Sequence, residues 1–379
     1  MDTSEHVLGT LLQVLALQVS EEPEEDAQET RTLEIDSGVE LSEAVLNGLD
    51  KEAVRAAMQR ELDALNRFEV YTTVPVSSVP PGNRVISTRW VVTVKPCGTV
   101  KARLVVRDLN DGSWQDTFSS TPSSVGLRCA LSVAASRGWS VLTGDLTAAF
   151  LHATVPDDEP IFVRAAAPLH KPGFCWRLRR ALYGLRQAPR LFQEWLSGQF
   201  EELGLVRCKS EPSLYVAQDS SLIVSCHVDD PVIMGSKASC EEFCTELAKR
   251  VAFKKGAYWS HDSWSRYLGR EWKLIEGGFA CRNPPQYYDE VFQTMGMSRC
   301  NPVAMPGANM KPLDEEYVGE DLHKVFRTAV GKLQWAADCR PDVLFSLKEL
   351  SRCLVRPTGD AFRALKRLVR YCQSHGSES

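Results

Sequence analysis

The sequence lacks several features that would assign it to a class at once. No apolar run approaches the ~20 residues of a membrane-spanning helix, and the apolar stretch near the N-terminus has an acidic flank and no small-residue cleavage site. The twelve cysteines contain no C-x-x-C pair, the seven histidines are dispersed, and no internal repeat is found. We therefore expect neither a membrane nor a secreted protein, reduced intracellular thiols, and no zinc cluster.

Positive charge is scarce at the N-terminus. Residues 1–50 carry 13 of the 49 acidic residues and one basic residue, Arg31. We expect residues 1–40 to form an acidic, disordered leader. Residues 51–379 carry 43 basic and 36 acidic residues, a modest excess that is compatible with a polyanionic ligand. At 379 residues, 44% hydrophobic and 25% charged, the chain is expected to be globular and to form two or three units.

Helical and strand patterns are mixed without a βαβ rhythm, which predicts an α+β fold. Apolar residues at helical spacing predict helices over 42–67, 123–137, 191–203 and 239–252, and over 286–297, 322–338, 343–353 and 360–372 in the last hundred residues. Strands are predicted over 85–107 as a hairpin, over 139–144 and 161–164, and near 267–272 and 279–281.

Three carboxylates point to metal chemistry. Two apolar runs rich in Val and Ile flank Asp229-Asp230 within residues 221–235, which predicts a β-hairpin with the pair at its tip. Taken alone, the pair fits a solvated turn. A third carboxylate, Asp145, follows the strand predicted at 139–144. Carboxylates gathered at strand ends repel one another unless a divalent cation lies among them, and oxygen-only ligands suit Mg²⁺. The sequence therefore predicts a Mg²⁺-dependent phosphoryl-transfer site.

A second feature is the basic character of the hairpin predicted over 85–107. It carries Lys95, Lys101, Arg103 and Arg107. These cations fit either a solvated edge or a finger that contacts phosphates, because clustered cations on a rigid ribbon suit a triphosphate or a nucleic-acid backbone.

Three motifs then occur in order: Asp145-Leu-Thr-Ala-Ala-Phe-Leu151, Ala181-Leu-Tyr-Gly-Leu-Arg-Gln-Ala-Pro-Arg190 and His227-Val-Asp-Asp230. Together they resemble the reverse transcriptase of copia-type LTR retrotransposons, and the resemblance extends from about residue 42 to 373. It implies a right-handed polymerase. An entry helix and fingers would occupy 41–140, a palm with an antiparallel sheet 141–275, and a helical thumb or connection 276–379.

The resemblance implies an RNA-directed DNA polymerase that adds dNTPs to a primer 3′ end by a two-metal mechanism, with two Mg²⁺ ions for which Mn²⁺ can substitute. The implied metal ligands are Asp145, Asp229, Asp230 and the main-chain carbonyl of Leu146. The implied nucleotide contacts are Lys101, Arg103, Ala149, Phe150 and Gln187. Phe150, which without the resemblance fits a core residue, would select deoxynucleotides. The implied template and primer contacts are Arg186, Arg190, His227, Val228, Tyr267, Leu268 and Gly269.

The resemblance also implies partners and a location. The partners are an RNA or DNA template with its primer, dNTPs, and the RNase H and integrase parts of the same polyprotein, with no membrane. The location is intracellular, either cytoplasmic in a virus-like particle or nuclear. We expect a piece of a polyprotein, because the chain stops at Ser379 before the acidic cluster of an RNase H domain and no integrase His/Cys module lies upstream. The triplet Asp36-Ser-Gly38, which matches aspartic proteases, is interpreted as chance.

The motifs depart from the family pattern in three places. His227 replaces the usual Tyr, Pro231 replaces an aliphatic residue, and Leu146-Thr147 replaces Val-Lys. Pro231 is expected to cost the hairpin one ladder bond unless it begins the strand. The intact carboxylates favour an active polymerase, whereas the departures favour an inactive remnant that retains the fold and at most binds nucleic acid. A two-metal nuclease unrelated to polymerases would leave Phe150 and the Gln187 loop unexplained.

Overall fold

The computed structural model describes residues 49–95, 97–109, 112, 115–307 and 316–375, and the main chain of residues 31–35; the side chains of 374 and 375 are not described. Predictions for 1–30 and 36–48 lie outside the described residues. The chain divides into two compact units. The larger comprises Gln28–His261 with Leu274–Phe279, and the described part of the smaller lies within Asp262–Lys273 and Ala280–Ser379. Each unit is described by itself.

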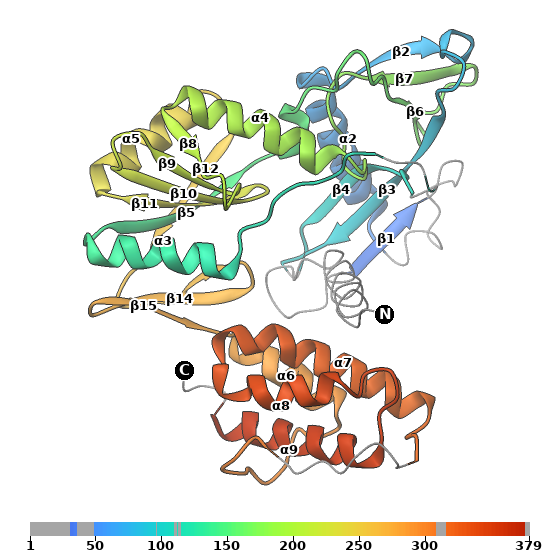
Figure 1. Cartoon of the computed structure of the whole chain (residues 1–379). Helices are drawn as coiled ribbons and strands as arrows, with labels where there is room; N and C mark the ends of the chain where they lie inside the picture. The colour runs from blue at the N-terminus through green and yellow to red at the C-terminus, as the bar shows by residue number, and fades with distance from the viewer. Residues whose placement is uncertain are drawn as a thin grey trace, which may run out of the picture. The chain divides into compact units, whose positions relative to one another are not determined.

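The first sheet of the larger unit has the strand order β1-β3-β6-β7-β2, with β4 on the other edge of β3 (Figure 1). Its strands are β1 (Arg31–Ile35), β2 (Tyr71–Pro75), β3 (Val85–Val94), β4 (Val100–Val106), β6 (Phe162–Arg164) and β7 (Phe174–Leu178). β3 and β4 form the predicted basic hairpin. Helix α2 (Lys51–Arg67) packs against β4. It begins after Asp50, whose carboxylate accepts from the Glu52 N–H at 2.9 Å, as expected for an N-cap.

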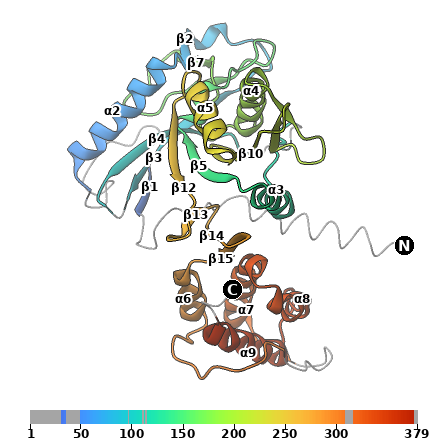
Figure 2. The ribbon, with the colours of Figure 1, turned by 90° about the vertical axis from the view of Figure 1, so that its left-hand side faces the viewer.

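The second sheet is antiparallel and has the order β12-β5-β11-β10-β9-β8. Its strands are β5 (Ser140–Leu146), β8 (Leu205–Arg207), β9 (Leu214–Ala217), β10 (Leu222–His227), β11 (Asp230–Gly235) and β12 (Phe253–Tyr258). Helices α4 (Ala188–Glu202) and α5 (Lys237–Ala248) cover one face, and α3 (Ser124–Ser136) covers the other (Figures 1 and 2). The central strands are therefore buried on both faces, which explains why β10 and β11 are almost continuously apolar.

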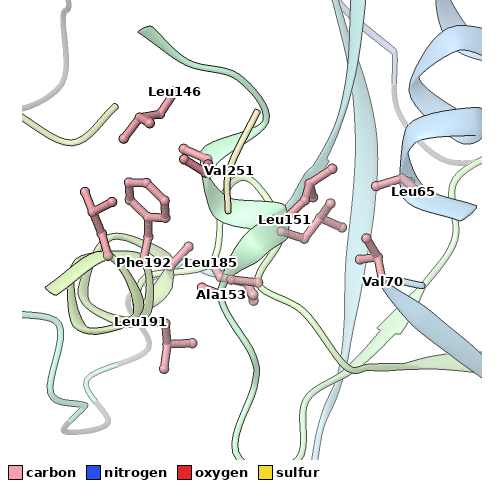
Figure 3. Packing of buried hydrophobic residues seen from close by; sticks show 14 of the residues in the cluster. Leu65, Val70, Leu146, Leu151, Ala153, Leu185, Leu191, Phe192 and Val251 are labelled. Carbon is pink, nitrogen blue, oxygen red and sulfur yellow. The ribbon is translucent and has the colours of Figure 1, made fainter. Parts of the chain in front are cut away.

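One hydrophobic core joins the two sheets of this unit. The short 3₁₀ helix η2 (Ala149–His152) lies in its middle, with Leu151 and Ala153 buried between residues of α4, such as Phe192, and residues next to α2, such as Val70 (Figure 3). The segment that follows Asp145 is thus anchored by apolar burial, which at about 25 cal/mol per Å² is the main favourable contribution to folding.

The smaller unit is mostly helical, as predicted for the C-terminal region. Helices α6 (Pro285–Thr294), α7 (Glu320–Ala336), α8 (Leu344–Ser351) and α9 (Gly359–His375) enclose a second apolar core. A three-stranded sheet, β13-β14-β15, precedes them. Its strands are β13 (Ser265–Tyr267), β14 (Arg270–Ile275) and β15 (Gly278–Arg282), and the boundary between the units passes through the last two. No helix within the described ranges is long and apolar enough to cross a membrane.

Several elements differ from the sequence prediction. Residues 31–35, within the leader predicted to be disordered, form β1 and pair with β3. Strand β5 includes Asp145, because the polar strand β12, which was not predicted, pairs with it there. The sequence of residues 146–151 is compatible with a helix, but Leu146 belongs to β5 and only residues 149–152 form a 3₁₀ helix. Helix α4 begins at Ala188 rather than at 191, because Pro189 fits the first helical turn.

Two glycines provide a test of the packing in the larger unit. Gly184 has φ +84° and a Cβ placed on it would lie 2.2 Å from the Val106 carbonyl oxygen, whereas Gly198, inside α4, faces open space. Gly184→Ala should lower the free energy of unfolding by more than about 1 kcal/mol, and Gly198→Ala should raise it by about 0.5–1 kcal/mol. Urea unfolding of both variants measures this. Changes of the same sign in both would contradict the described packing.

Candidate active site

The end of β5 and the tip of the β10–β11 hairpin meet in the second sheet. The main-chain N–H of Leu146 donates to the carbonyl of Asp229 at 2.8 Å. His227 and Asp230 form the last pair of the hairpin ladder, so the two-residue tip is Val228-Asp229 and not the predicted Asp229-Asp230. The side chain of Asp145 is exposed, and those of Asp229 and Asp230 are half-buried. Asp145 and the consecutive pair Asp229-Asp230, far apart in sequence, are therefore carried by directly neighbouring main-chain segments.

The hairpin tip has an uncommon backbone conformation. Val228 has a positive φ of +50°, whereas φ of Asp229 is not positive. This combination is that of a type II′ turn, which usually has glycine at the first position. A β-branched residue is strained there. The Cys226 thiol donates to the Val228 carbonyl at 3.4 Å and helps to hold the tip.

Pro231 lies directly after the tip and is buried. The ladder between β11 and β5 begins one residue later, at Val232↔Thr143. Proline has no N–H to donate. Pro231 lies between the first pair of this ladder, at Val232, and the hydrogen bond from Leu146 to Asp229, so its missing N–H falls where the ladder has no pair. The proline sits as the second residue of β11, so the hairpin forms in spite of it.

The aromatic side chains beside the carboxylates form a packed wall. The half-buried Phe150 ring meets the Tyr183 ring edge to face at 5.3 Å between centroids, and the Arg103 guanidinium lies 5.1 Å from the Tyr183 centroid. Burial raises the pKa of Tyr183 to about 12; Arg103 opposes this increase, and the charges of Asp229 and Asp145 add to it. The phenol therefore stays protonated beside the carboxylates.

The loop that contains Gln187 is fixed to β4 by a residue that the sequence did not single out. Asp108 is buried, forms an ion pair with Arg84, and accepts from the Arg186 main-chain N–H at 3.0 Å. The Val106 N–H donates to the Tyr183 carbonyl at 2.8 Å. Gln187 itself is buried just before α4. The sequence alone does not reveal the role of Asp108, because its partners, Arg84 and Arg186, are brought to it only by the fold.

A second unrecognised residue is Lys254 on β12. The register of β12 and β5 pairs Lys254 directly with Asp145. Directly opposed side chains lie on the same face of a sheet, with Cβ atoms about 5 Å apart. Lys254 thus supplies a cation opposite Asp145, where the sequence motif has lost the usual Lys. Its neighbour Lys255 contacts Glu241 at 2.7 Å instead.

The basic residues predicted to contact phosphates differ in their surroundings. Lys101 and Arg103 are exposed on β4. Arg190 is committed to contacts within the protein: it pairs with Glu194 at 2.9 Å and donates to the Asp116 carbonyl at 2.9 Å. Ala149 is buried within η2.

Three residues predicted to contact the primer lie in the smaller unit, namely Tyr267, Leu268 and Gly269. Tyr267 pairs with Arg270, so Leu268 and Gly269 form a two-residue turn. Both have positive φ, 48° and 71°, as in a type I′ turn. They form a hairpin tip of their own, separate from the hairpin of Asp229 and Asp230.

Comparison with known proteins decides the family. The family described as "Reverse transcriptase (RNA-dependent DNA polymerase)" matches residues 68–309, more than half of the chain. The chain belongs to this reverse transcriptase family. The resemblance to copia-type reverse transcriptases and the α+β fold predicted from the sequence are thereby confirmed.

Polyproteins of plant transposons are among the similar proteins. The Retrovirus-related Pol polyprotein from transposon RE1 of Arabidopsis thaliana is 31% identical over 346 residues, which is 86% of this chain and 23% of that protein. The corresponding polyprotein from transposon TNT 1-94 of Nicotiana tabacum is 27% identical over 359 residues, 86% of this chain and 26% of that protein. The chain thus spans about a quarter of the length of these relatives. A solved foamy viral protease-reverse transcriptase in complex with dsDNA aligns with a TM-score of 0.49 and 13% identity, over 99% of this chain and 69% of that one.

A row of rings connects the wall to the core of the larger unit. Phe150 contacts Phe192, Phe192 stacks on Trp195, and Trp195 stacks on His152 at 4.9 Å between centroids. Nε2 of His152 is buried without a hydrogen-bond partner. Burial lowers the pKa of His152, and the charges of Arg180 and Arg67 lower it further.

His152 should therefore make the fold sensitive to acid. Because its pKa is lower in the folded than in the unfolded state, only the unfolded chain gains this proton as the pH falls below about 6.5, so stability decreases in that range. In the variant His152→Phe, which keeps a ring against Trp195, the free energy of unfolding should fall less between pH 7.5 and 5.5 than in the wild type. Urea titrations at both pH values measure this, and parallel losses would contradict the described environment.

Proposed function

We propose that this chain is an active RNA-directed DNA polymerase that extends a primer 3′ end with dNTPs. The observation that carries the proposal is the adjacency of the end of β5, with Asp145, to the Val228-Asp229 tip and the following Asp230, through the Leu146–Asp229 hydrogen bond. All three carboxylates of the motif are intact, and Asp145 and Asp229 act electrostatically on Tyr183 of the aromatic wall. Membership of the reverse transcriptase family supports the same reaction.

The metal requirement is part of the proposal. The donors at the tip are carboxylate and carbonyl oxygens, the set that Mg²⁺ prefers. No group of three or more His, Cys, Asp or Glu side chains in the described residues is arranged to hold a metal ion. The proposal of a Mg²⁺ site therefore depends on the chemistry of these oxygen donors and on the neighbouring main-chain segments that carry them. Asp145, Asp229, Asp230 and the Leu146 carbonyl would hold two Mg²⁺ ions, with Mn²⁺ as a substitute. When bound, the ions would lower the pKa of the primer 3′-hydroxyl and neutralise the triphosphate.

The protein's own residues would bind and orient the substrates. Phe150 would face the incoming sugar, where its ring leaves no room for a 2′-hydroxyl. Gln187 would hydrogen-bond the nucleotide, and Asp108 positions it through the Arg186 N–H. Lys101 and Arg103, exposed on β4, would bind the triphosphate.

The remaining site residues would hold the nucleic acid. His227 and Val228 at one hairpin tip, and Tyr267, Leu268 and Gly269 at the other, would contact the primer. Arg186 and Arg190 would contact template or primer phosphates, although Arg190 must first release Glu194.

An inactive remnant remains the second candidate. The observations that favour it are His227 in place of Tyr and Pro231 next to the carboxylates. The hairpin forms with both residues in place, which supports the active form.

Primer extension on an RNA template tests the proposal. Asp229→Asn should reduce Mg²⁺-dependent incorporation at least about 100-fold, because loss of a metal ligand should cost more than the 10–100-fold typical of outer-shell partners. Asp219→Asn is the matched control: this carboxylate lies outside the site and accepts from the Ser221 N–H at 3.0 Å. Equal incorporation by wild type and Asp229→Asn would indicate a contaminating polymerase. No incorporation by a folded wild type would favour the remnant.

Lys254 should set the Mg²⁺ requirement. Lys254 lies opposite Asp145 in the register of β12 and β5, and its charge would compete with a bound cation. Lys254→Met should therefore lower the Mg²⁺ concentration for half-maximal activity by roughly 2–5-fold, the equivalent of about 0.5–1 kcal/mol for an exposed pair. Lys255→Met, which removes a cation that pairs with Glu241, should leave it unchanged. Mg²⁺ titrations of both variants measure this. An equal shift in both would show a general charge effect.

A further inference from the structure

Two cysteines of the smaller unit lie in direct contact. The Sγ atoms of Cys281, in β15, and Cys339, at the end of the 3₁₀ helix η3 (Ala337–Cys339), are 3.1 Å apart. A disulfide bond has a length of about 2.05 Å, so the two sulfurs need to approach by only about 1 Å. The two residues are separated by 58 positions in the chain. The fold, and not their proximity in sequence, brings them together.

The main chains around the two thiols are fixed by other contacts. On the Cys339 side, Asp338 pairs with Arg270 at 2.7 Å. On the Cys281 side, the buried amide of Asn283 donates to the Ala336 carbonyl at 2.8 Å. These bonds connect the strands directly to the end of α7. The thiols are thus held together before any covalent bond forms, which raises the effective concentration of one at the other.

We propose that Cys281 and Cys339 are the site of a reversible intramolecular disulfide. With glutathione disulfide as the oxidant, the thiolate of Cys281, the more exposed of the two, attacks one glutathione sulfur and releases a glutathione thiolate. The thiolate of Cys339 then attacks the Cys281 sulfur and releases the second glutathione. The two protein thiols lose two electrons and two protons in total, and one glutathione disulfide is reduced to two thiols. The new bond joins β15 covalently to the end of the α7–η3 segment.

Other cysteines provide a contrast within the same chain. The hydroxyls of Thr99 and Ser210 lower the pKa of the thiols of Cys97 and Cys208, so these two should react readily with an oxidant. Each of these sulfurs contacts a hydroxyl group, and among the described residues no second cysteine contacts it, so both should form mixed disulfides with glutathione. Burial raises the pKa of Cys240 to about 12 and that of Cys244 to about 11, so these two should stay unreactive.

The test is thiol mapping of the whole chain. Folded protein is equilibrated with a reduced and oxidised glutathione buffer, blocked with N-ethylmaleimide, digested and analysed by mass spectrometry. We expect a peptide pair cross-linked through Cys281 and Cys339, with two of the twelve thiols lost to it, and glutathione adducts on Cys97 and Cys208. Addition of dithiothreitol should remove the cross-link. The oxidised chain should also unfold at a higher urea concentration than the reduced chain, because the cross-link restricts the unfolded state.

The variants Cys281→Ser and Cys300→Ser complete the design. Cys300 lies in the same unit, is similarly half-exposed, and its thiol donates to Gln373 at 2.7 Å. Cys281→Ser should abolish both the cross-link and the shift in urea midpoint, whereas Cys300→Ser should keep both. The mapping of the wild type does not depend on either variant folding. Alkylated Cys281 and Cys339 in a sample whose Cys97 is fully glutathionylated would overturn the proposal, as would a cross-link between other cysteines.

Discussion

The hydrogen bond from the Leu146 N–H to the Asp229 carbonyl fixes the end of β5 against the tip of the β10–β11 hairpin. This contact places three like charges on neighbouring segments, an arrangement that is unfavourable unless the rest of the fold enforces it. The fold does so with apolar burial. Leu146, which makes this contact, and Cys226, near the end of β10, are buried in the core of the larger unit. Helices cover both faces of the sheet that contains β5 and β10 (Figure 2).

Two basic residues and an aromatic ring lie around this contact. Lys254 is paired with Asp145 across β12 and β5, and Arg103 lies over the ring of Tyr183. Tyr183 keeps its proton, since burial and the nearby carboxylates both oppose its ionisation. The region therefore combines carboxylate oxygens with an uncharged aromatic wall on one side, which suits the metal ions and the phosphate substrate of the proposed function.

The sequence predicted the parts of this site that depend on local pattern. The hairpin was predictable because Val and Ile runs flank Asp229 and Asp230, and α3 because its apolar residues recur at helical spacing. Strand β12 was missed, because its sequence is polar and contains a glycine, and it forms only because β5 offers an edge. Lys254 was missed for the same reason, since the register between two strands about a hundred residues apart is not a local property. Asp108 gains its partners only in the folded chain.

If Asp145 and Asp229 are close enough to share a cation, their charges must interact, and a double-mutant cycle measures this interaction directly. The free energies of unfolding of the wild type, Asp145→Asn, Asp229→Asn and the double variant are compared at low ionic strength without divalent ions. The structure predicts that each single substitution stabilises the fold by relieving repulsion, and that the second adds little to the first, giving a coupling free energy of at least about 0.5 kcal/mol. Strictly additive changes would show that the two carboxylates do not interact and are too far apart to share a cation.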